Sequence, residues 1–187
     1  MNEVSAKSFK NNGYCLVQNA LDQKFAATAA LYTLFKDGHD KLNSNEDSNY
    51  ADPFTESLLA NMKPMIEEFT GIKVLSTYST FLVNYDGKEV EESKSIKKSQ
   101  EITGFLCVGY DYDNALYYWD IKIGEKVFQL NPGDMIIYRA NSVSFSRPFF
   151  KPRKDFFESN IILNYVEKDG SNSNLEYDGR EFLGIKP

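Results

Sequence analysis

The sequence changes character at Gly71, and this change limits the folds that the chain can adopt. Residues 73–85 (KVLSTYSTFLVNY) are rich in β-branched and aromatic residues, which pack well on the pleated surface of a sheet. Further strand-like segments lie at 101–108, 116–123, 126–130, 135–139, 143–146 and 157–166. Short turns such as NPGD (131–134) separate them, because Gly tolerates positive φ and Pro presets φ at the start of a turn. Many short strands joined by tight turns predict a β-sandwich or barrel.

The segment before residue 52 suits one short strand and one helix. Residues 13–17 (GYCLV) favour a strand after a polar start. An Ala-rich helix is expected from Asp22 to about Phe35, and Gly38 is placed to end it. The polar residues 39–51 show no periodicity and predict a loop.

A second helix has clear signals at both ends. Asp52 can act as the N-cap, Pro53 suits the first helical position, and Gly71 suits the C-cap. Pro64 is expected to kink this helix. Its buried face is predicted from apolar residues spaced three to four positions apart: Phe54, Leu58, Met62, Ile66 and Phe69.

Helices followed by a run of strands predict an α+β fold. The chain has 187 residues, which suits one domain, with a helical part at about 1–71 and a β core at about 72–180.

Composition limits the classes of partner. Acidic residues outnumber basic ones by 27 to 21, so the chain lacks the basic surface of a general nucleic-acid binder. No apolar run approaches the ~20 residues of a membrane span, and the first residues have no signal-peptide core. Cys15 and Cys107 each lie among apolar residues, so we expect buried free thiols in a cytoplasmic protein.

Four segments in order carry a family resemblance: ADPFTESLLANMKPMIEEFTGIKVLSTYSTFLVNYDGKEV (51–90), EITGFLCVGYD (101–111), LNPGDMIIYRANSVSFSRPF (130–149) and NIILNYVEKDG (160–170). Their order and spacing resemble the Fe(II)/2-oxoglutarate-dependent dioxygenases, over about residues 50–180. The resemblance implies a double-stranded β-helix (a jelly roll, cupin-like) with N-terminal supporting helices. In that family two His and one carboxylate hold the iron.

The sequence departs from the family at the iron ligands. Depending on a one-residue insertion, the family's His-x-Asp falls on Ser93 and Ser95 or on Lys94 and Ile96, and its distal His falls near Phe145. The chain contains one histidine, His39, so one chain cannot supply two. His39 is expected in a helix-to-loop corner, away from the β core. We therefore predict no metal ligands and no cofactor.

An anion pocket is a further expectation from the resemblance. In the family, a basic residue beyond the distal His binds the far carboxylate of 2-oxoglutarate, often with a strand Tyr. Arg153 or Lys154 lies at the corresponding place, and Tyr78 and Tyr85 lie on the first strand. Arg139 is expected to be structural and to pair with a neighbouring acid.

The functional hypothesis is a non-iron, non-catalytic relative that binds a small molecule or a protein partner. Two enzyme alternatives stay open: an oxygenase with an atypical metal set, using Fe(II) and 2-oxoglutarate, or a metal-free activity in the same cavity. A third class is an assembly protein that uses an exposed strand edge. Fold alone does not choose among them.

Overall fold

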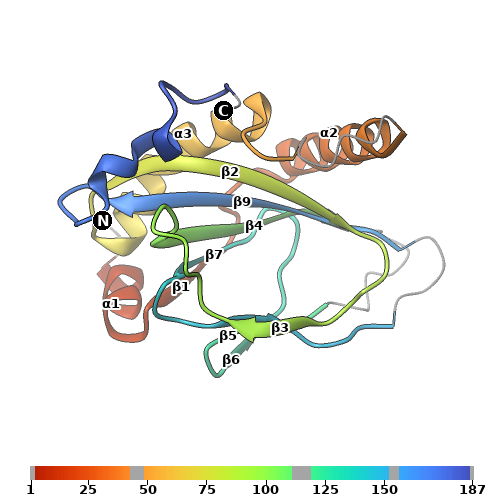
Figure 1. Ribbon diagram of the computed structural model, residues 1–187. Coiled ribbons are helices and arrows are strands. Elements are labelled where there is room, and N and C mark those ends of the chain that lie inside the picture. The colour runs from red at the N-terminus through yellow and green to blue at the C-terminus, as the bar shows by residue number, and fades with distance from the viewer. Residues whose placement is uncertain (1–2, 43–48, 111–118, 152–155, 186–187) are drawn as a thin grey trace.

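The computed structural model describes residues 3–42, 49–110, 119–151 and 156–185 and contains two facing sheets with helices on one side (Figure 1). The five-stranded sheet has the order β1-β7-β4-β9-β2, and the four-stranded sheet has the order β3-β8-β5-β6. All pairings are antiparallel. The fold is α+β with a double-stranded β-helix, as predicted.

The strands of the five-stranded sheet are β1 (Tyr14–Val17), β2 (Val74–Asn84), β4 (Ile102–Tyr110), β7 (Met135–Arg139) and β9 (Glu158–Glu167). Those of the four-stranded sheet are β3 (Val90–Ser93), β5 (Ile121–Ile123), β6 (Lys126–Phe128) and β8 (Phe145–Arg147).

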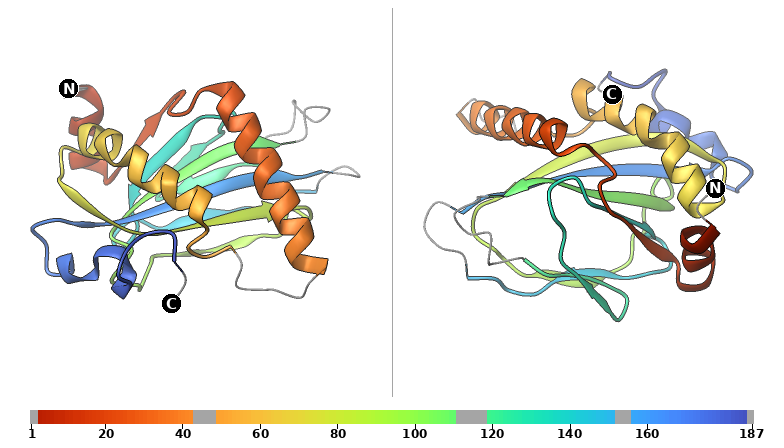
Figure 2. Two further views of the ribbon diagram at one scale, coloured as in Figure 1. Left: turned by 90° about the horizontal axis from the view of Figure 1, so that it is seen from above. Right: turned by 180° about the vertical axis from the view of Figure 1, so that it is seen from behind.

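Three helices lie on the side of the five-stranded sheet away from the other sheet, two across its face and the first at its edge beside β1 (Figure 2). They are α1 (Glu3–Asn12), α2 (Gln23–Leu42) and α3 (Pro53–Thr70). α2 packs on β4, and α3 packs on β2. None of the helices in the described ranges is long and apolar enough to cross a membrane.

The capping residues of α3 act as the sequence predicts. Asp52 Oδ1 accepts hydrogen bonds from the backbone N–H groups of Phe54 (3.0 Å) and Thr55 (3.2 Å). Gly71 takes the left-handed conformation, φ 72°, and its N–H donates to the Glu67 carbonyl. Helix α3 continues through Pro64.

The NPGD turn also needs its glycine. Gly133 has φ +93°, and a Cβ atom there would lie 2.4 Å from the Leu21 carbonyl oxygen. The turn therefore fixes the close approach of the chain before α2 to the loop between β6 and β7.

Side chains of the five-stranded sheet alternate between two cores. On the helix side, Phe81, Ile161, Leu163 and Tyr165 belong to the larger core with α1 and α3. The other face points between the sheets, where Phe105, Cys107, Ile136 and Tyr138 pack with Ile121 and Ile123 of the four-stranded sheet. We call the space between the two sheets the barrel interior.

The structure corrects several element predictions. Gly38 does not end its helix, and His39 lies within α2 rather than at a corner, because α2 continues to Leu42. Tertiary contacts hold the end of this helix: the Tyr85 hydroxyl donates to Asp37 Oδ2 at 2.9 Å. Helix α1, strand β3 and the 3-10 segment Ser173–Gly179 (η2) were not predicted.

Candidate functional site

Strand β9 contributes a polar row to the barrel interior. Glu158, Asn160, Ile162 and Asn164 alternate with the helix-side residues of this strand, and they pair in register with Tyr110, Cys107, Phe105 and Thr103 of β4. Because Phe105 and Cys107 lie in the core between the sheets, their β9 partners face the same space. Three of the four β9 side chains in this row are polar and buried.

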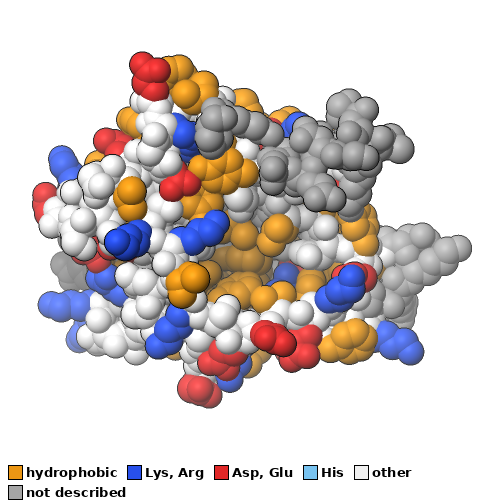
Figure 3. Space-filling model, in the orientation of Figure 1, with side chains coloured by type: hydrophobic (Ala, Val, Ile, Leu, Met, Phe, Trp, Pro, Cys, Tyr) orange, Lys and Arg blue, Asp and Glu red, His pale blue; other side chains and the backbone are white. Residues whose placement is uncertain are grey.

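The interior is open to solvent between the edge strands β2 and β3. Leu82 of β2 pairs with Asn160 and therefore faces inward, yet 42% of it is exposed. Inward-facing Thr80, Ile162 and Phe145 are half-buried rather than buried. In the space-filling view the surface is hollowed between β2 and β3, with hydrophobic side chains at its floor (Figure 3). Small molecules can therefore approach the interior from this side.

Phe145 occupies part of this interior. Its ring lies 5.3 Å from that of Phe105 and 6.0 Å from that of Tyr138, measured between centroids. Burial raises the pKa of Tyr138, an effect that a hydrogen bond with Thr103 partly offsets. An aromatic cluster with a neutral phenol thus fills the middle of the interior.

The two serines assigned to the family's His-x-Asp have different surroundings. Ser93 is exposed and pairs with Phe145 across β3 and β8. Ser95 lies beyond β3, and its hydroxyl donates to Gln100 Oε1 at 2.8 Å. Gln100 then donates to Thr103 (3.3 Å), which donates to Asn164 Oδ1 (2.9 Å). Ser95 is therefore part of a hydrogen-bond chain that leads into the interior.

A buried ion pair lies in the interior beside the aromatic cluster. Arg147 Nη2 is 2.7 Å from Glu158 Oε2, and the two side chains are 2% and 8% exposed. The same nitrogen donates to the Trp119 carbonyl at 2.8 Å, and the guanidinium carbon lies 3.6 Å from the Trp119 ring centroid. Burial lowers the pKa of Arg147 and raises that of Glu158, and each charge opposes the shift of the other.

Four buried polar side-chain atoms in the described part of the chain have no hydrogen-bond partner. They are Arg147 Nε, Asn160 Nδ2, Asn160 Oδ1 and Asn164 Nδ2. The Asn160 amide lies near the Glu158 carboxylate but not in hydrogen-bonding geometry. All four atoms belong to residues that face the barrel interior. An unsatisfied buried polar group costs about 1–3 kcal/mol, so a row of them along the interior face of β9 and beside Glu158 calls for a functional explanation.

Of the four predicted anion-pocket residues, Tyr78 and Tyr85 are described, and their side chains have different partners. Tyr78 faces inward, and its ring lies 5.2 Å from that of Tyr50. The hydroxyl of Tyr85 is bound to Asp37 on α2. Burial raises the pKa of each phenol to about 12. Arg153 and Lys154 lie outside the described residues, so the four-residue pocket stays a prediction.

Two other predicted residues are placed clearly. Arg139 pairs with Glu167 at 2.5 Å, which confirms the predicted pairing with an acid. The backbone of His39 belongs to α2, on the face of the five-stranded sheet opposite the interior. Within the described ranges, no three His, Cys, Asp or Glu side chains are grouped so that they could hold a metal ion.

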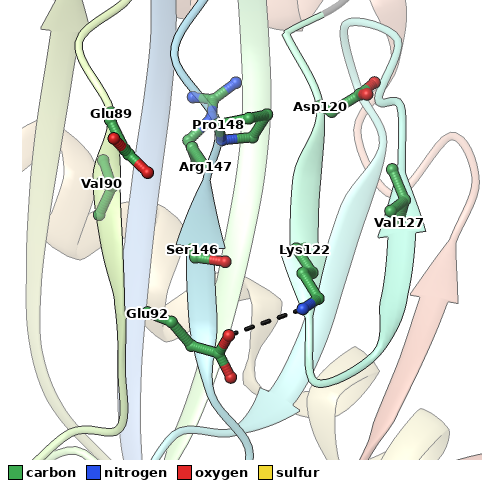
Figure 4. A pocket seen from close by; sticks show the side chains of 9 residues that line it. All are labelled: Glu89, Val90, Glu92, Asp120, Lys122, Val127, Ser146, Arg147 and Pro148. Atoms are coloured by element: carbon green, nitrogen blue, oxygen red, sulfur yellow. Dashed lines mark ion pairs between the residues drawn. The ribbon is translucent and has the colours of Figure 1, made fainter.

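A second concave surface lies on the outer face of the four-stranded sheet (Figure 4). It is a pocket of about 330 Å³ that includes Glu92, Asp120 and Lys122. Its charges are largely paired with one another, because Lys122 Nζ lies 3.6 Å from Glu92 and Gln129 donates to Asp120 at 2.9 Å. Arg147 also lines this pocket, but Asn160 and Asn164 do not, so it is the weaker candidate.

Sequence reasoning did not single out the polar residues of the interior. Arg147, Glu158, Asn160 and Asn164 come from two strands whose facing becomes evident only after pairing. One signal was present: in ESNIILNYVE the polar residues 158, 160 and 164 share one face of an extended strand. A strand that is otherwise apolar rarely carries three polar residues on one buried face.

No protein-family model matches the chain, and no curated protein matches it in sequence. Several solved structures are similar to the chain in fold. CytC3 superimposes with a TM-score of 0.66 at 16% identity, covering 96% of this chain and 81% of that one. SnoN, a non-heme alpha ketoglutarate dependent epimerase from nogalamycin biosynthesis, gives 0.65 at 11%, covering 99% and 91%. A Pseudomonas putida prolyl-4-hydroxylase gives 0.62 at 10%, covering 88% and 98%. The chain thus has the double-stranded β-helix fold found in Fe(II)/2-oxoglutarate oxygenases.

Proposed function

We propose that this chain is a relative of the 2-oxoglutarate oxygenases that does not use iron, and that it binds a small polar molecule in the barrel interior without oxidising it. The observation that carries this proposal is the row of unpartnered side-chain atoms of Arg147, Asn160 and Asn164 along the interior. A ligand with hydrogen-bonding groups would satisfy the part of this row that it reaches. Because these atoms lie inside the barrel, a small molecule explains them better than a protein partner on the surface.

The residues at the family's iron position do not fit the metal. A facial triad needs two imidazoles and a carboxylate, whereas Ser93, Ser95 and Phe145 offer two hydroxyls and a phenyl ring. The alternative pair, Lys94 and Ile96, offers an amine and an alkyl chain. The phenyl ring also fills space next to Phe105 and Tyr138. No step of the proposed function therefore involves a metal.

Access to the interior requires small side-chain movements. The amides of Asn160 and Asn164 are fully buried, and half-exposed Leu82 and Ile162 lie on the same face beside them. On the edge strand β2, Leu82 lies opposite Asn160 and Tyr78 lies opposite Asn164. Rotation of Leu82 would open a path to the Asn160 amide, and such rotamer changes are common on binding.

Purified protein is expected to bind neither Fe(II) nor 2-oxoglutarate stoichiometrically. Elemental analysis together with an anaerobic titration of Fe(II) plus 2-oxoglutarate checks this, and no charge-transfer absorption should develop. Micromolar stoichiometric binding that disappears in Glu91→Ala or Glu92→Ala would instead support an oxygenase with an altered ligand set.

The substitution Asn160→Leu is expected to stabilise the ligand-free protein. Leu has a similar branched shape and removes an amide whose two polar atoms have no partner, so the free energy of unfolding should rise by about 1 kcal/mol. Urea denaturation monitored by circular dichroism measures it.

Asn164→Leu is the matched control for this experiment. Asn164 Oδ1 accepts a hydrogen bond from Thr103, so this substitution should lower the free energy of unfolding. If both variants lose stability alike, the Asn160 amide has a structural partner in solution, and the argument for a ligand site fails.

A further inference from the structure

We infer that the interior contains a carboxylate-binding site, formed by Arg147 and Trp119, that the chain fills with its own Glu158, so that the ligand of the interior is neutral and accepts hydrogen bonds. The part of this inference that concerns the ligand rests on the proposed function, whereas the carboxylate site does not depend on it. It is carried by the geometry of the ion pair and by the kinds of atom left without partners.

The surroundings of Arg147 suit a bound carboxylate. The guanidinium is 2% exposed, the Trp119 ring covers its face at 3.6 Å, and the Trp119 carbonyl accepts from Nη2. Burial and stacking remove competing water, and a carboxylate is the anion that the planar guanidinium fork matches. The site is therefore preorganised for one carboxylate.

Glu158 fills this site without using its full capacity. Nη2 alone contacts both carboxylate oxygens, at 3.0 and 2.7 Å, while Nε on the same edge of the guanidinium has no partner. A bidentate contact would use Nε and Nη2 together, one for each oxygen. The tether of Glu158 to β9 accounts for the incomplete contact, and a free carboxylate would not have this restraint.

The charge balance then limits the ligand. Glu158 neutralises Arg147, so this pair offers no net positive charge to a second carboxylate in a low-dielectric space. Three of the four unpartnered atoms (Arg147 Nε, Asn160 Nδ2 and Asn164 Nδ2) are donors, and one is an acceptor. Near the ion pair the unpartnered atoms are Arg147 Nε and those of the Asn160 amide, so the complementary ligand is an uncharged molecule with carbonyl or hydroxyl oxygens. The neutralised pair favours such a ligand over an acid such as 2-oxoglutarate.

Two other ion pairs that contain a buried or partly buried arginine do not share this arrangement. Arg180 and Glu56 are fully bonded between α3 and the segment after β9. Arg139 and Glu167 are each about one-third exposed. Among the described residues, the Arg147–Glu158 pair combines burial, an aromatic cover and an unused donor.

The test is chemical rescue of Glu158→Ala. This substitution leaves a space the size of a small carboxylate next to an uncompensated guanidinium. We expect the melting temperature to fall by several degrees in sodium chloride. Sodium formate at the same concentration should restore at least half of the loss in a saturable way. With a Kd of about 10 mM, about 100 mM formate would raise the folding equilibrium constant about tenfold.

Two controls separate site filling from a general salt effect. Wild-type protein and the double variant Arg147→Leu/Glu158→Ala should melt at the same temperature in formate and in chloride. If Glu158→Ala does not fold in chloride, refolding in formate supports the site. Equal stability in both salts, or no folding in either, overturns the inference.

The result is independent of the test of the proposed function. Formate rescue concerns only Arg147 and the space left by Glu158, whereas Asn160→Leu tests whether an interior amide is kept for a ligand. Rescue together with a destabilising Asn160→Leu would establish the carboxylate site and refute the ligand proposal. No rescue together with a stabilising Asn160→Leu would refute the carboxylate site and support the ligand proposal.

Discussion

Replacing Phe81 with alanine is expected to lower the free energy of unfolding by about 3–5 kcal/mol, as is typical of a phenyl ring removed from a core. Phe81 is fully buried in the core between the five-stranded sheet and the helices, and it pairs with Ile161 across β2 and β9. Most domains have a total stability of about 5–15 kcal/mol, so this single change would remove a large share.

Phe105→Ala is expected to have a comparable effect for a different reason. Its ring is 3% exposed and lies between the sheets, 5.3 Å from the Phe145 ring and 5.9 Å from the Arg147 guanidinium. Removing it leaves a cavity beside the buried ion pair. Phe81→Ala thus tests the core under the helices, and Phe105→Ala tests the core of the barrel interior.

Phe35→Ala is the matched control, because it removes the same side chain from the surface of α2, where Phe35 is 74% exposed. A surface substitution of this kind changes stability by no more than about 0.5 kcal/mol. Urea denaturation of the three variants, with the slope checked for constancy, gives the comparison. Values for Phe81→Ala and Phe105→Ala close to that of Phe35→Ala would mean that the strand facing is wrong.

Much of the fold was predictable because its signals are local. The segment 135–139 was predicted as a strand and forms β7, Met135–Arg139, since a continuous apolar run after a Pro-Gly turn leaves few alternatives. Asp52, Pro53 and Gly71 mark the ends of α3 for the same reason: caps act through neighbouring backbone groups. The order of these elements then restricts the architecture to an α+β barrel.

The elements that sequence reasoning missed depend on contacts from elsewhere in the chain. All four residues of β3 are exposed, so no apolar pattern marks this strand, and pairing with β8 defines it. Helix α2 continues past Gly38 because its last turns contact the sheet: Thr33 bonds to Ser159 at 2.6 Å and Asp37 to Tyr85. A single Gly costs a helix about 1 kcal/mol, which such contacts offset.

In the candidate site, too, some residues were predictable from local patterns and others depend on strand pairing. Strand alternation predicts that Phe145 shares a face with Val143, because a period of two is a local property. Which face of β9 meets the barrel interior depends on its register with β2 and β4, so the row of Glu158, Asn160 and Asn164 could not be assigned from the sequence. For the same reason, the sequence does not identify Glu158 as the partner of Arg147.

The segment after β9 is held by one buried carboxylate. Glu56, in the first turn of α3, accepts hydrogen bonds from Arg180 Nη2 (2.6 Å) and Nη1 (3.1 Å) and from the Gly184 N–H. Arg180 also donates to the carbonyls of Thr77 and Ile185. The carboxylate of Glu56 and the guanidinium of Arg180 are 1% and 3% exposed.

The backbone of this segment carries strain that these bonds must offset. Tyr177 and Asp178 both have positive φ, 59° and 55°, which costs roughly 1–2 kcal/mol for each non-glycine residue. The Tyr50 hydroxyl binds Asp178 at 2.6 Å, and the Arg180 guanidinium lies 5.3 Å from the Tyr50 ring. Residues 173–185 are therefore held in place mainly by contacts to Tyr50, β2 and α3, because non-helical φ/ψ angles at 175–178 interrupt the 3-10 segment.

Glu56→Ala is expected to lower the free energy of unfolding by about 3–5 kcal/mol, because it leaves the Arg180 guanidinium buried without its counterion. Hydrogen exchange of residues 173–185 should also become much faster, since the anchor of this segment is lost. Glu125→Ala is the control: its carboxylate is 95% exposed and 3.7 Å from Lys122, and a surface pair contributes little. If Glu56→Ala loses stability while exchange in residues 173–185 stays slow, Tyr50 and the backbone contacts hold the segment, and Glu56 serves only to neutralise Arg180.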